Sequence, residues 1–266
     1  MALGDGKFQA ALYKGGLPGS GAEGNEFVLL KGETKDGKTT LKASGGEAVV
    51  INGHTATGTN GDKKLFVYDR VNRKSPTLGK KPPNGAKILF GGKEADRFSN
   101  GKKLDGELLK EGVVSMDSFG DFTLHLEFRT PYKPKTKPGS QDRGNSGVYI
   151  FNNYETQILD SFGIKGEFNF CGALYRKKPP VVNMCLPPLA WQTYDIEFTT
   201  PRFKDGKKVK NARITTRHNG VLIHDDFELD KGTGAGGGRP EKEKGQIHLQ
   251  GHGNPVRFKN IWLIER

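Results

Sequence analysis

Residues 121–160, DFTLHLEFRTPYKPKTKPGSQDRGNSGVYIFNNYETQILD, decide the fold of this chain. Three short segments in this stretch alternate polar and apolar residues with period two, which predicts β-strands with two unlike faces. The first segment alternates an apolar set with a polar set, Leu124, Leu126 and Phe128 against His125, Glu127 and Arg129. A strand face that meets only water usually carries Lys, Ser and Thr. Glu, Gln, His and Arg beside aromatic residues instead predict the lining of a groove.

The same alternation continues in the other segments of this group. Val148 and Ile150 alternate with Gly147, Tyr149 and Phe151 in the second segment, and Thr156 and Ile158 alternate with Glu155 and Gln157 in the third. It returns in GQIHLQGHGNP, residues 245–255, where His248 and Gln250 alternate with Ile247 and Leu249. We therefore expect these segments to be neighbouring strands of one sheet. Their apolar sides would pack on a second sheet, and their polar sides would form one concave surface.

The composition predicts an all-β fold. The chain of 266 residues contains 38 Gly and 14 Pro, and it has no helical periodicity beyond about two turns. No apolar run is long enough for a spanning helix, so no membrane span is expected. The first residues, MALGDGKFQA, lack a charged region followed by an apolar stretch, so no signal peptide is expected there. A secreted or periplasmic location, with the signal peptide already removed, is the expectation.

The net charge of +12 would attract acidic polymers. The basic residues, however, cluster in apparent Pro/Gly loops such as residues 71–87, and no RNP-like strand or recognition helix accompanies them. No specific nucleic-acid partner is therefore expected, and the sequence does not predict an oligomeric state.

Cys171 and Cys185 are the two cysteines of the chain. Two thiols without further cysteines make a poor zinc site. They form either one disulfide, which would suit an exported protein, or two buried free thiols.

The chain divides at a Pro/Gly/Lys-rich linker, residues 75–85. Before it, residues 1–74 hold short strand-like runs separated by turns such as Asp36-Gly37 and Asn52-Gly53, which predict a small antiparallel β module. After it, residues 86–266 form the larger domain. There the Asn219-Gly220 pair predicts a hairpin, whose flanking His218 and His224 we expect at the surface.

Seven pieces of the larger domain resemble one family in this order: DFTLHLEFR, GNSGVYI, YETQILDS, CGALY, WQTYDIEF, NGVLI and IHLQGHGNPVRFKNIWL. They are similar to the 3-keto-disaccharide hydrolase domain family over residues 86–266. The resemblance implies a concanavalin-like jelly-roll β-sandwich whose concave sheet binds a carbohydrate partner, a sugar oxidised at its third carbon.

A ketone at the third carbon acidifies the hydrogen on the second carbon, so that a base can remove it and the group on the first carbon can leave. Addition of water then completes a net hydrolysis. The step needs a base, an acid for the leaving group and stabilisation of the enolate. The catalytic candidates are Glu127, His248, Glu155 and Tyr175, of which Glu127 or His248 would be base or acid and Tyr175 a donor to the leaving group. The substrate-binding candidates are Arg129, Asn145, Gln157, Asp160, Trp191, Gln250 and His252.

Three alternatives remain at this point. Glu127 and Glu155 would serve as the two acids of a conventional glycosidase if they lie about 5–10 Å apart. The domain would instead be a lectin-like binding module if it only holds sugar. A divalent metal is a third option, with Glu155, Asp160, His248 and His252 as ligands, although their spacing matches no standard site. Two residues have other roles open to them: Trp191 in the core or at a strand start, and His252 in hydrogen bonds of the GHGNP turn.

Overall fold

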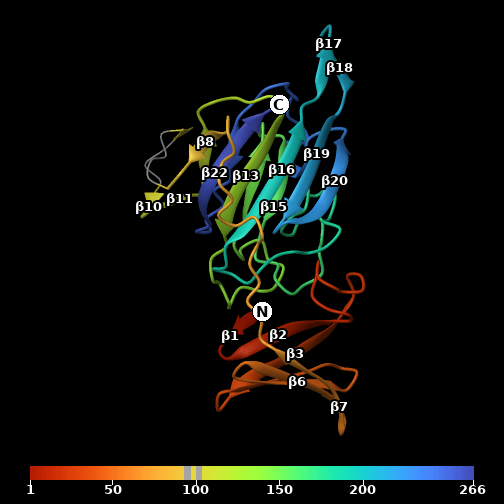
Figure 1. Cartoon of the computed structure of the whole chain (residues 1–266). Helices are drawn as coiled ribbons and strands as arrows, with labels where there is room; N and C mark the ends of the chain where they lie inside the picture. Colours follow the sequence, from red (N-terminus) through yellow and green to blue (C-terminus); the bar gives the residue numbers. More distant parts are fainter. Residues whose placement is uncertain (93–96, 100–103) are drawn as a thin grey trace.

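The computed structural model describes residues 1–92, 97–99 and 104–266 (Figure 1). Its regular elements are β-strands apart from one short 3-10 helix, η1 (Gly234–Gly236). The prediction of an all-β fold is therefore confirmed. No helix in the described ranges combines the length and apolar character that crossing a bilayer would need.

The first part of the chain forms a seven-stranded antiparallel meander, here called the N-terminal sheet. Each strand pairs with the next along the chain, as expected where Asp-Gly and Asn-Gly turns join short strands. A small core of Leu30, Leu41 and Val49 lies on one side of it. Its strands are β1 (Ala2–Gly4), β2 (Lys7–Tyr13), β3 (Phe27–Lys35), β4 (Lys38–Lys42), β5 (Glu47–Asn52), β6 (Thr55–Asn60) and β7 (Lys63–Asp69).

Two further sheets pack face to face as a jelly-roll-like β-sandwich. The wide sheet, of eight strands, has the order β10-β11-β22-β13-β16-β19-β20, with β8 paired to β22. The prominent Asn219-Gly220 hairpin joins β19 to β20, as predicted. The strands are β8 (Lys87–Phe90), β10 (Leu104–Asp105), β11 (Leu108–Lys110), β13 (Phe122–Arg129), β16 (Gln192–Thr199), β19 (Ala212–His218), β20 (Val221–Leu229) and β22 (Arg257–Glu265).

The narrow sheet, of five strands, has the order β15-β14-β21-β12-β9. Its strands are β9 (Phe98–Ser99), β12 (Val113–Ser115), β14 (Ser146–Ile150), β15 (Tyr154–Ile158) and β21 (Ile247–Leu249). A separate hairpin of β17 (Arg202–Lys204) and β18 (Lys207–Lys210) projects from the wide sheet (Figure 1).

The core between the two sheets comes from the alternating apolar positions. Leu124 and Leu126 of the wide sheet and Val148 and Leu249 of the narrow sheet belong to one fully buried cluster. Because successive side chains of a strand point to opposite faces, the residues between these positions lie on the outer faces of the sandwich. The polar sets therefore face away from the core in both sheets.

The prediction that all four polar segments share one sheet is wrong for the first of them. Strand β13 lies in the wide sheet between β22 and β16, whereas β14, β15 and β21 lie in the narrow sheet. Glu127 on β13 and Glu155 on β15 consequently occupy opposite outer faces of the sandwich. The predicted single concave surface is thus two surfaces.

A connector, residues 70–86, links the N-terminal sheet to the sandwich and crosses the outer face of the wide sheet (Figure 1). Its Ser75 hydroxyl lies 2.6 Å from the hydroxyl of Thr193, and the Lys80 carbonyl accepts hydrogen bonds from Asn260 and Trp262. The loop between β2 and β3 is also tied to the sandwich directly, since Asn25 donates to the Val181 carbonyl at 2.7 Å. The predicted linker, residues 75–85, thus lies within a connector that is docked on the sandwich.

Two local predictions are also resolved by the structure. His218 and His224 are buried rather than at the surface, with 0% and 1% of their area exposed. The Nε2–H group of His218 donates to Oε1 of Gln192, and the Nε2–H group of His224 donates to the Gly172 carbonyl. Cys171 and Cys185 are buried free thiols, so of the two alternatives the disulfide is absent.

Candidate functional site

The β14–β15 hairpin positions the carboxylate of Glu155 on the outer face of the narrow sheet. Glu155 stands directly opposite Tyr149 in the antiparallel register and receives a hydrogen bond from its hydroxyl. The carboxylate lies over Gly147, where any Cβ would collide with its Oε1 atom. The absence of a side chain at Gly147 thus leaves the space that this carboxylate occupies.

Glu155 is almost fully enclosed, with 2% of its surface exposed. Burial raises the pKa of its carboxyl to about 7, although the hydrogen bond from Tyr149 acts in the opposite direction. Its Oε2 atom has no hydrogen-bond partner among the described residues. A carboxyl group that titrates near neutral pH and keeps one oxygen unused can both take up and return a proton.

A chain of amides lies beside this carboxylate. Gln141 accepts hydrogen bonds from Asn145 at 3.1 Å and from Gln157 at 2.9 Å. These bonds orient both amides, yet the Oδ1 atom of Asn145 and the Oε1 atom of Gln250 have no partner in the described structure. Together with Glu155 Oε2 they are three buried acceptors without donors. Buried acceptors left unsatisfied are costly, and the hydroxyl groups of a bound sugar would satisfy them.

His248 comes to the same face from β21. It stands opposite Tyr149 in the register, and the two rings are stacked with centroids 5.8 Å apart. Its Nδ1 atom lies 3.2 Å from Oδ1 of Asn152, a residue that takes a left-handed conformation (φ 58°) in the β14–β15 turn. Arg239 donates to the Asn152 carbonyl at 2.7 Å. Burial raises the pKa of Tyr149, and the positive charge of Arg239 lies close enough to act in the opposite direction. The turn therefore brings together the imidazole of His248, the ring of Tyr149 and the guanidinium of Arg239.

Tyr175 lies at the border of the site, in a segment whose backbone pairs with the edge of β15. The Tyr175 amide donates to the Glu155 carbonyl at 3.1 Å, and the Gly172 amide donates to the Gln157 carbonyl at 2.9 Å. The ring of Tyr175 packs against Gly234, where a Cβ would collide with it. The glycine-rich segment after β20 thus closes over the tyrosine at the edge of the narrow sheet.

Six of the predicted site residues are therefore brought to one face, and they are Asn145, Glu155, Gln157, Tyr175, His248 and Gln250. The predicted Glu127, Arg129 and Trp191 lie elsewhere, on the outer side of the wide sheet. Trp191 is flanked there by two cations, with Arg129 Cζ at 5.2 Å and Lys259 Nζ at 4.2 Å from its ring centroid.

Glu127 belongs to a closed polar network beneath the connector. Its Oε1 accepts the Gly79 amide at 2.6 Å and the Asn260 amide at 2.8 Å. His125 Nδ1 lies 2.8 Å from Asp195, which also accepts a hydrogen bond from Thr77. Burial alone would raise the pKa of Glu127, but the hydrogen bonds of His125, Asn260 and Gly79 outweigh it and the pKa is lowered. This carboxylate stays ionised and fully occupied.

Asp160 and the backbone of His252 take part in contacts that hold loops of the fold. Asp160 is paired with the buried Arg143, whose Nε atom donates to Oδ2 at 2.8 Å. Arg143 also donates to the Thr136 carbonyl, so the ion pair holds the long loop after β13. His252 is exposed, and its carbonyl accepts a hydrogen bond from Asn254 within the GHGNP turn.

These positions remove two of the alternatives. Glu127 and Glu155 are separated by both sheets, so no sugar can lie between them as a two-carboxylate glycosidase requires. Within the described residues, no three His, Cys, Asp or Glu side chains come together in a way that would hold a metal ion. The four candidate metal ligands therefore do not form one site.

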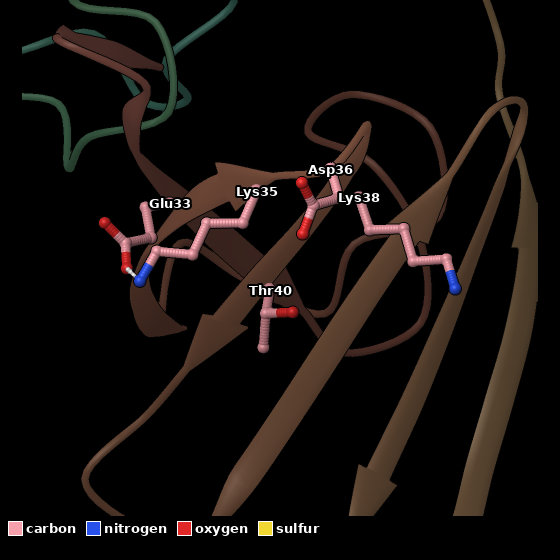
Figure 2. A pocket seen from close by; sticks show the side chains of 5 residues that line it. All are labelled: Glu33, Lys35, Asp36, Lys38 and Thr40. Atoms are coloured by element: carbon pink, nitrogen blue, oxygen red, sulfur yellow. Dashed lines mark ion pairs between the residues drawn. The ribbon is translucent and has the colours of Figure 1, made fainter.

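A hollow of about 360 Å³ lies away from this face, at the β3–β4 hairpin of the N-terminal sheet (Figure 2). Lys35 is turned toward Glu33 there and forms an ion pair with it at 2.6 Å. Asp36 takes the left-handed conformation (φ 47°) that the tight turn needs. These charged side chains are exposed and belong to one hairpin, and we assign no function to them.

Sequence reasoning missed four residues of the site, and they are Gln141, Tyr149, Asn152 and Arg239. Tyr149 carried a signal, because it alternates with buried Val148 and Ile150 in the same strand. Arg239 carried none, since it lies in a glycine-rich segment with no recognisable motif.

Comparisons with known proteins agree with this fold. A sequence model of the 3-keto-alpha-glucoside-1,2-lyase-like domain matches residues 85–264. The solved structure described as "a putative glycosyl hydrolase from Parabacteroides distasonis ATCC 8503" is 29% identical over 69% of this chain and 85% of its own, with a TM-score of 0.62. A second structure from that organism, given the same description, is 18% identical over 68% of this chain and 94% of its own, with a TM-score of 0.50, and supports the fold alone. No curated protein matches the chain.

Proposed function

This chain belongs to the 3-keto-alpha-glucoside-1,2-lyase-like domain family, and on that premise we propose that it cleaves the glycosidic bond of 3-keto glycosides on the outer face of the narrow sheet. The glycosyl hydrolase description of its structural neighbour supports a carbohydrate-directed activity. The observation that carries the finer proposal is Glu155, a nearly buried carboxyl with a pKa of about 7 and an unpartnered Oε2.

Glu155 acts as the base in this proposal. Removal of the proton from the second sugar carbon forms a carbanion that the neighbouring ketone stabilises as an enolate. At neutral pH about half of a carboxyl population with this pKa is ionised, so Glu155 can accept that proton without leaving its buried position. An ordinary exposed glutamate would be a much weaker base.

The remaining residues orient the sugar and stabilise charge. The unpartnered oxygens of Asn145 and Gln250 accept hydrogen bonds from sugar hydroxyls. The guanidinium of Arg239, near Tyr149, offsets the negative charge of the enolate oxygen. Tyr175 or His248 gives a proton to the oxygen of the departing group as the bond at the first carbon breaks. Water then adds to the unsaturated ketone, which makes the net reaction a hydrolysis.

The decisive experiment uses p-nitrophenyl 3-keto-glucoside and the same compound with an unoxidised sugar. We expect nitrophenol release only from the keto compound. In D₂O, the sugar product should carry deuterium at the second carbon, because that carbon loses its proton and later regains one from solvent. A direct displacement at the first carbon would leave the second carbon undeuterated and would contradict the proposal.

Binding without any release of nitrophenol would identify a lectin-like module instead. Isothermal titration calorimetry with both compounds gives this second reading. His248→Ala and Tyr175→Phe, measured by cleavage of a 3-keto disaccharide and by calorimetry, then separate the two candidate acids, because a sugar leaving group needs a proton and nitrophenolate does not. The one that supplies the proton should lose turnover while it still binds the keto compound.

A further inference from the structure

A cavity of about 660 Å³ lies at the junction of the N-terminal sheet, the connector and the sandwich. Its walls come from β2, from the connector and from the segment that precedes β16. None of the residues that line it belongs to the candidate active site on the narrow sheet. A large part of its wall comes from residues before position 85, outside the family match, so the cavity is additional to the family domain.

The walls of this cavity are mostly apolar and aromatic. Tyr13, Phe162 and Trp191 line it together with several aliphatic residues. Three large aliphatic side chains that line it are also exposed to solvent, with Leu17 at 41%, Val71 at 65% and Leu189 at 55%. Exposed apolar side chains from three separate segments that meet at one opening are typical of a ligand site.

Leu189 adds an independent sign of a built site. Its backbone takes a left-handed conformation with φ 68°, which is rare for a leucine. The Leu189 amide donates to the Thr130 carbonyl at 2.9 Å, which fixes the segment against the sandwich. Strained backbone of this kind persists where the surroundings enforce it, and it concentrates at binding sites.

The polar character of the cavity is cationic. Arg70, Arg73 and Lys74 line it, and none of the described lining residues is an aspartate or glutamate. Arg73 is half-buried, and desolvation lowers the pKa of its guanidinium. Within the described part of the chain, Arg73 has no hydrogen bond, ion pair or ring contact. A desolvated guanidinium without an acceptor favours a carboxylate, which it can bind through two parallel hydrogen bonds.

We propose that this cavity binds an amphipathic carboxylate, a small molecule with an apolar chain or ring, and that Arg73 receives its carboxylate group. The apolar part lies against Tyr13, Phe162 and Trp191, while Arg70 and Lys74 attract the anion from the rim. The charge of the cavity selects an acid over the corresponding alcohol or amine.

The test uses the full chain and three probes with the same ten-carbon tail: decanoate, decanol and decyltrimethylammonium. Isothermal titration calorimetry should show one decanoate per chain, with a dissociation constant at least tenfold below that of decanol. Arg73→Gln should raise the decanoate constant to that of decanol, whereas Arg73→Lys should retain part of the preference. Equal affinity for decanoate and decanol, or a stoichiometry well above one, would overturn the proposal.

A charge-reversal variant gives a switch of ligand preference, which a loss of folding could not produce. Arg73→Glu should abolish the preference for decanoate and create one for decyltrimethylammonium. A cavity-filling variant, Ala11→Trp, should weaken all three probes, because Ala11 lines the apolar wall. Unchanged decanoate binding in Arg73→Glu would show that the probe binds elsewhere and would refute the assignment.

Discussion

The two outer faces of the sandwich carry similar polar side chains but differ in whether the buried polar atoms have hydrogen-bond partners. On the wide sheet, His125 and Glu127 lie under the connector, and no buried polar atom of either residue lacks a partner. On the narrow sheet, Glu155 and its neighbours leave three buried acceptors without a donor. The first face is complete within the chain. The second leaves acceptors that no described residue supplies with a donor and that are available to a bound ligand.

This difference shows how a face covered by the chain itself can be distinguished from a face that binds a ligand. Both faces show polar residues at alternate strand positions, so the alternation by itself does not identify a site. The pKa directions do separate them, because the network around Glu127 lowers the pKa of that carboxyl, whereas burial raises the pKa of Glu155. Ionisation is stabilised on one face and disfavoured on the other, which is typical of a structural pair and a proton-transfer group respectively.

The largest expected effect concerns activity. Glu155→Gln removes the proposed base and should lower nitrophenol release from a 3-keto glycoside by about a thousandfold, the usual contribution of a general base. Glu127→Gln should leave the rate of the folded protein within about threefold, because the two faces are separated by the core. Equal losses in the two variants, each corrected for the folded fraction, would break the comparison.

The next effect concerns stability, and here we expect the larger change from Glu127→Gln rather than from Glu155→Gln. Glu127→Gln weakens the charge-assisted hydrogen bonds under the connector and should lower the free energy of unfolding by about 3 kcal/mol. Glu155→Gln should be neutral or slightly stabilising, since it removes a charge that burial already disfavours. Urea unfolding of both variants measures this. A more stable Glu127→Gln protein would show that the network does not hold the connector.

A third effect concerns the dependence of stability on pH, and it compares the buried histidines of the wide sheet. Burial lowers the pKa of His218 to about 3 and of His224 to about 4, so both are neutral when folded and take up protons on unfolding below pH 6.5. Stability is therefore lost as the pH falls from 6.5, by about 2 kcal/mol for each histidine at pH 5.

His125 has the opposite sign and provides the control. Burial lowers its pKa, but the hydrogen bonds with Asp195 and Glu127 outweigh this and raise it, so its contribution is present at acid pH and is lost as the pH rises. Between pH 5 and 7, His224→Gln should make the slope of unfolding free energy against pH less positive, and His125→Asn should make it more positive. The same slope in all three proteins would contradict these assignments.

The smallest effect concerns the pH profile of activity. If Glu155 is the base, turnover should fall as the pH drops below about 7, where its carboxyl becomes protonated. Tyr149→Phe removes the hydrogen bond that lowers this pKa, so the acid limb should move to higher pH by roughly one unit. The profile of kcat/KM from pH 5 to 9 measures the shift. A movement to lower pH would show that Tyr149 does not stabilise the ionised carboxylate.

Local chemistry predicted much of the fold. The Asn219-Gly220 hairpin and the meander of the first strands follow from turn residues and strand-like runs, and the alternation identified Glu155, Gln157 and His248 as outward-facing. The placement of β13 could not be predicted in this way. Period two states which residues share a face of one strand, but it does not state which strand lies beside it.

Long-range contacts account for the other errors. Nothing near Gly79 in the sequence indicates that its amide binds Glu127, 48 residues away. The same holds for His218, whose partner Gln192 lies 26 residues earlier across the sheet. Trp191 and Arg129 were both predicted to bind substrate, and they lie side by side on the face next to the connector, away from Glu155.

The docked connector also constrains the order in which the chain can fold. Trp262 donates to the carbonyl of Lys80, 182 residues earlier, so this contact cannot form before the last strand has been made. The N-terminal sheet, whose pairings join consecutive strands, can close early, because short loops cost little entropy. During synthesis on the ribosome, the first sheet would therefore be complete while its attachment to the rest waits for the final residues to emerge.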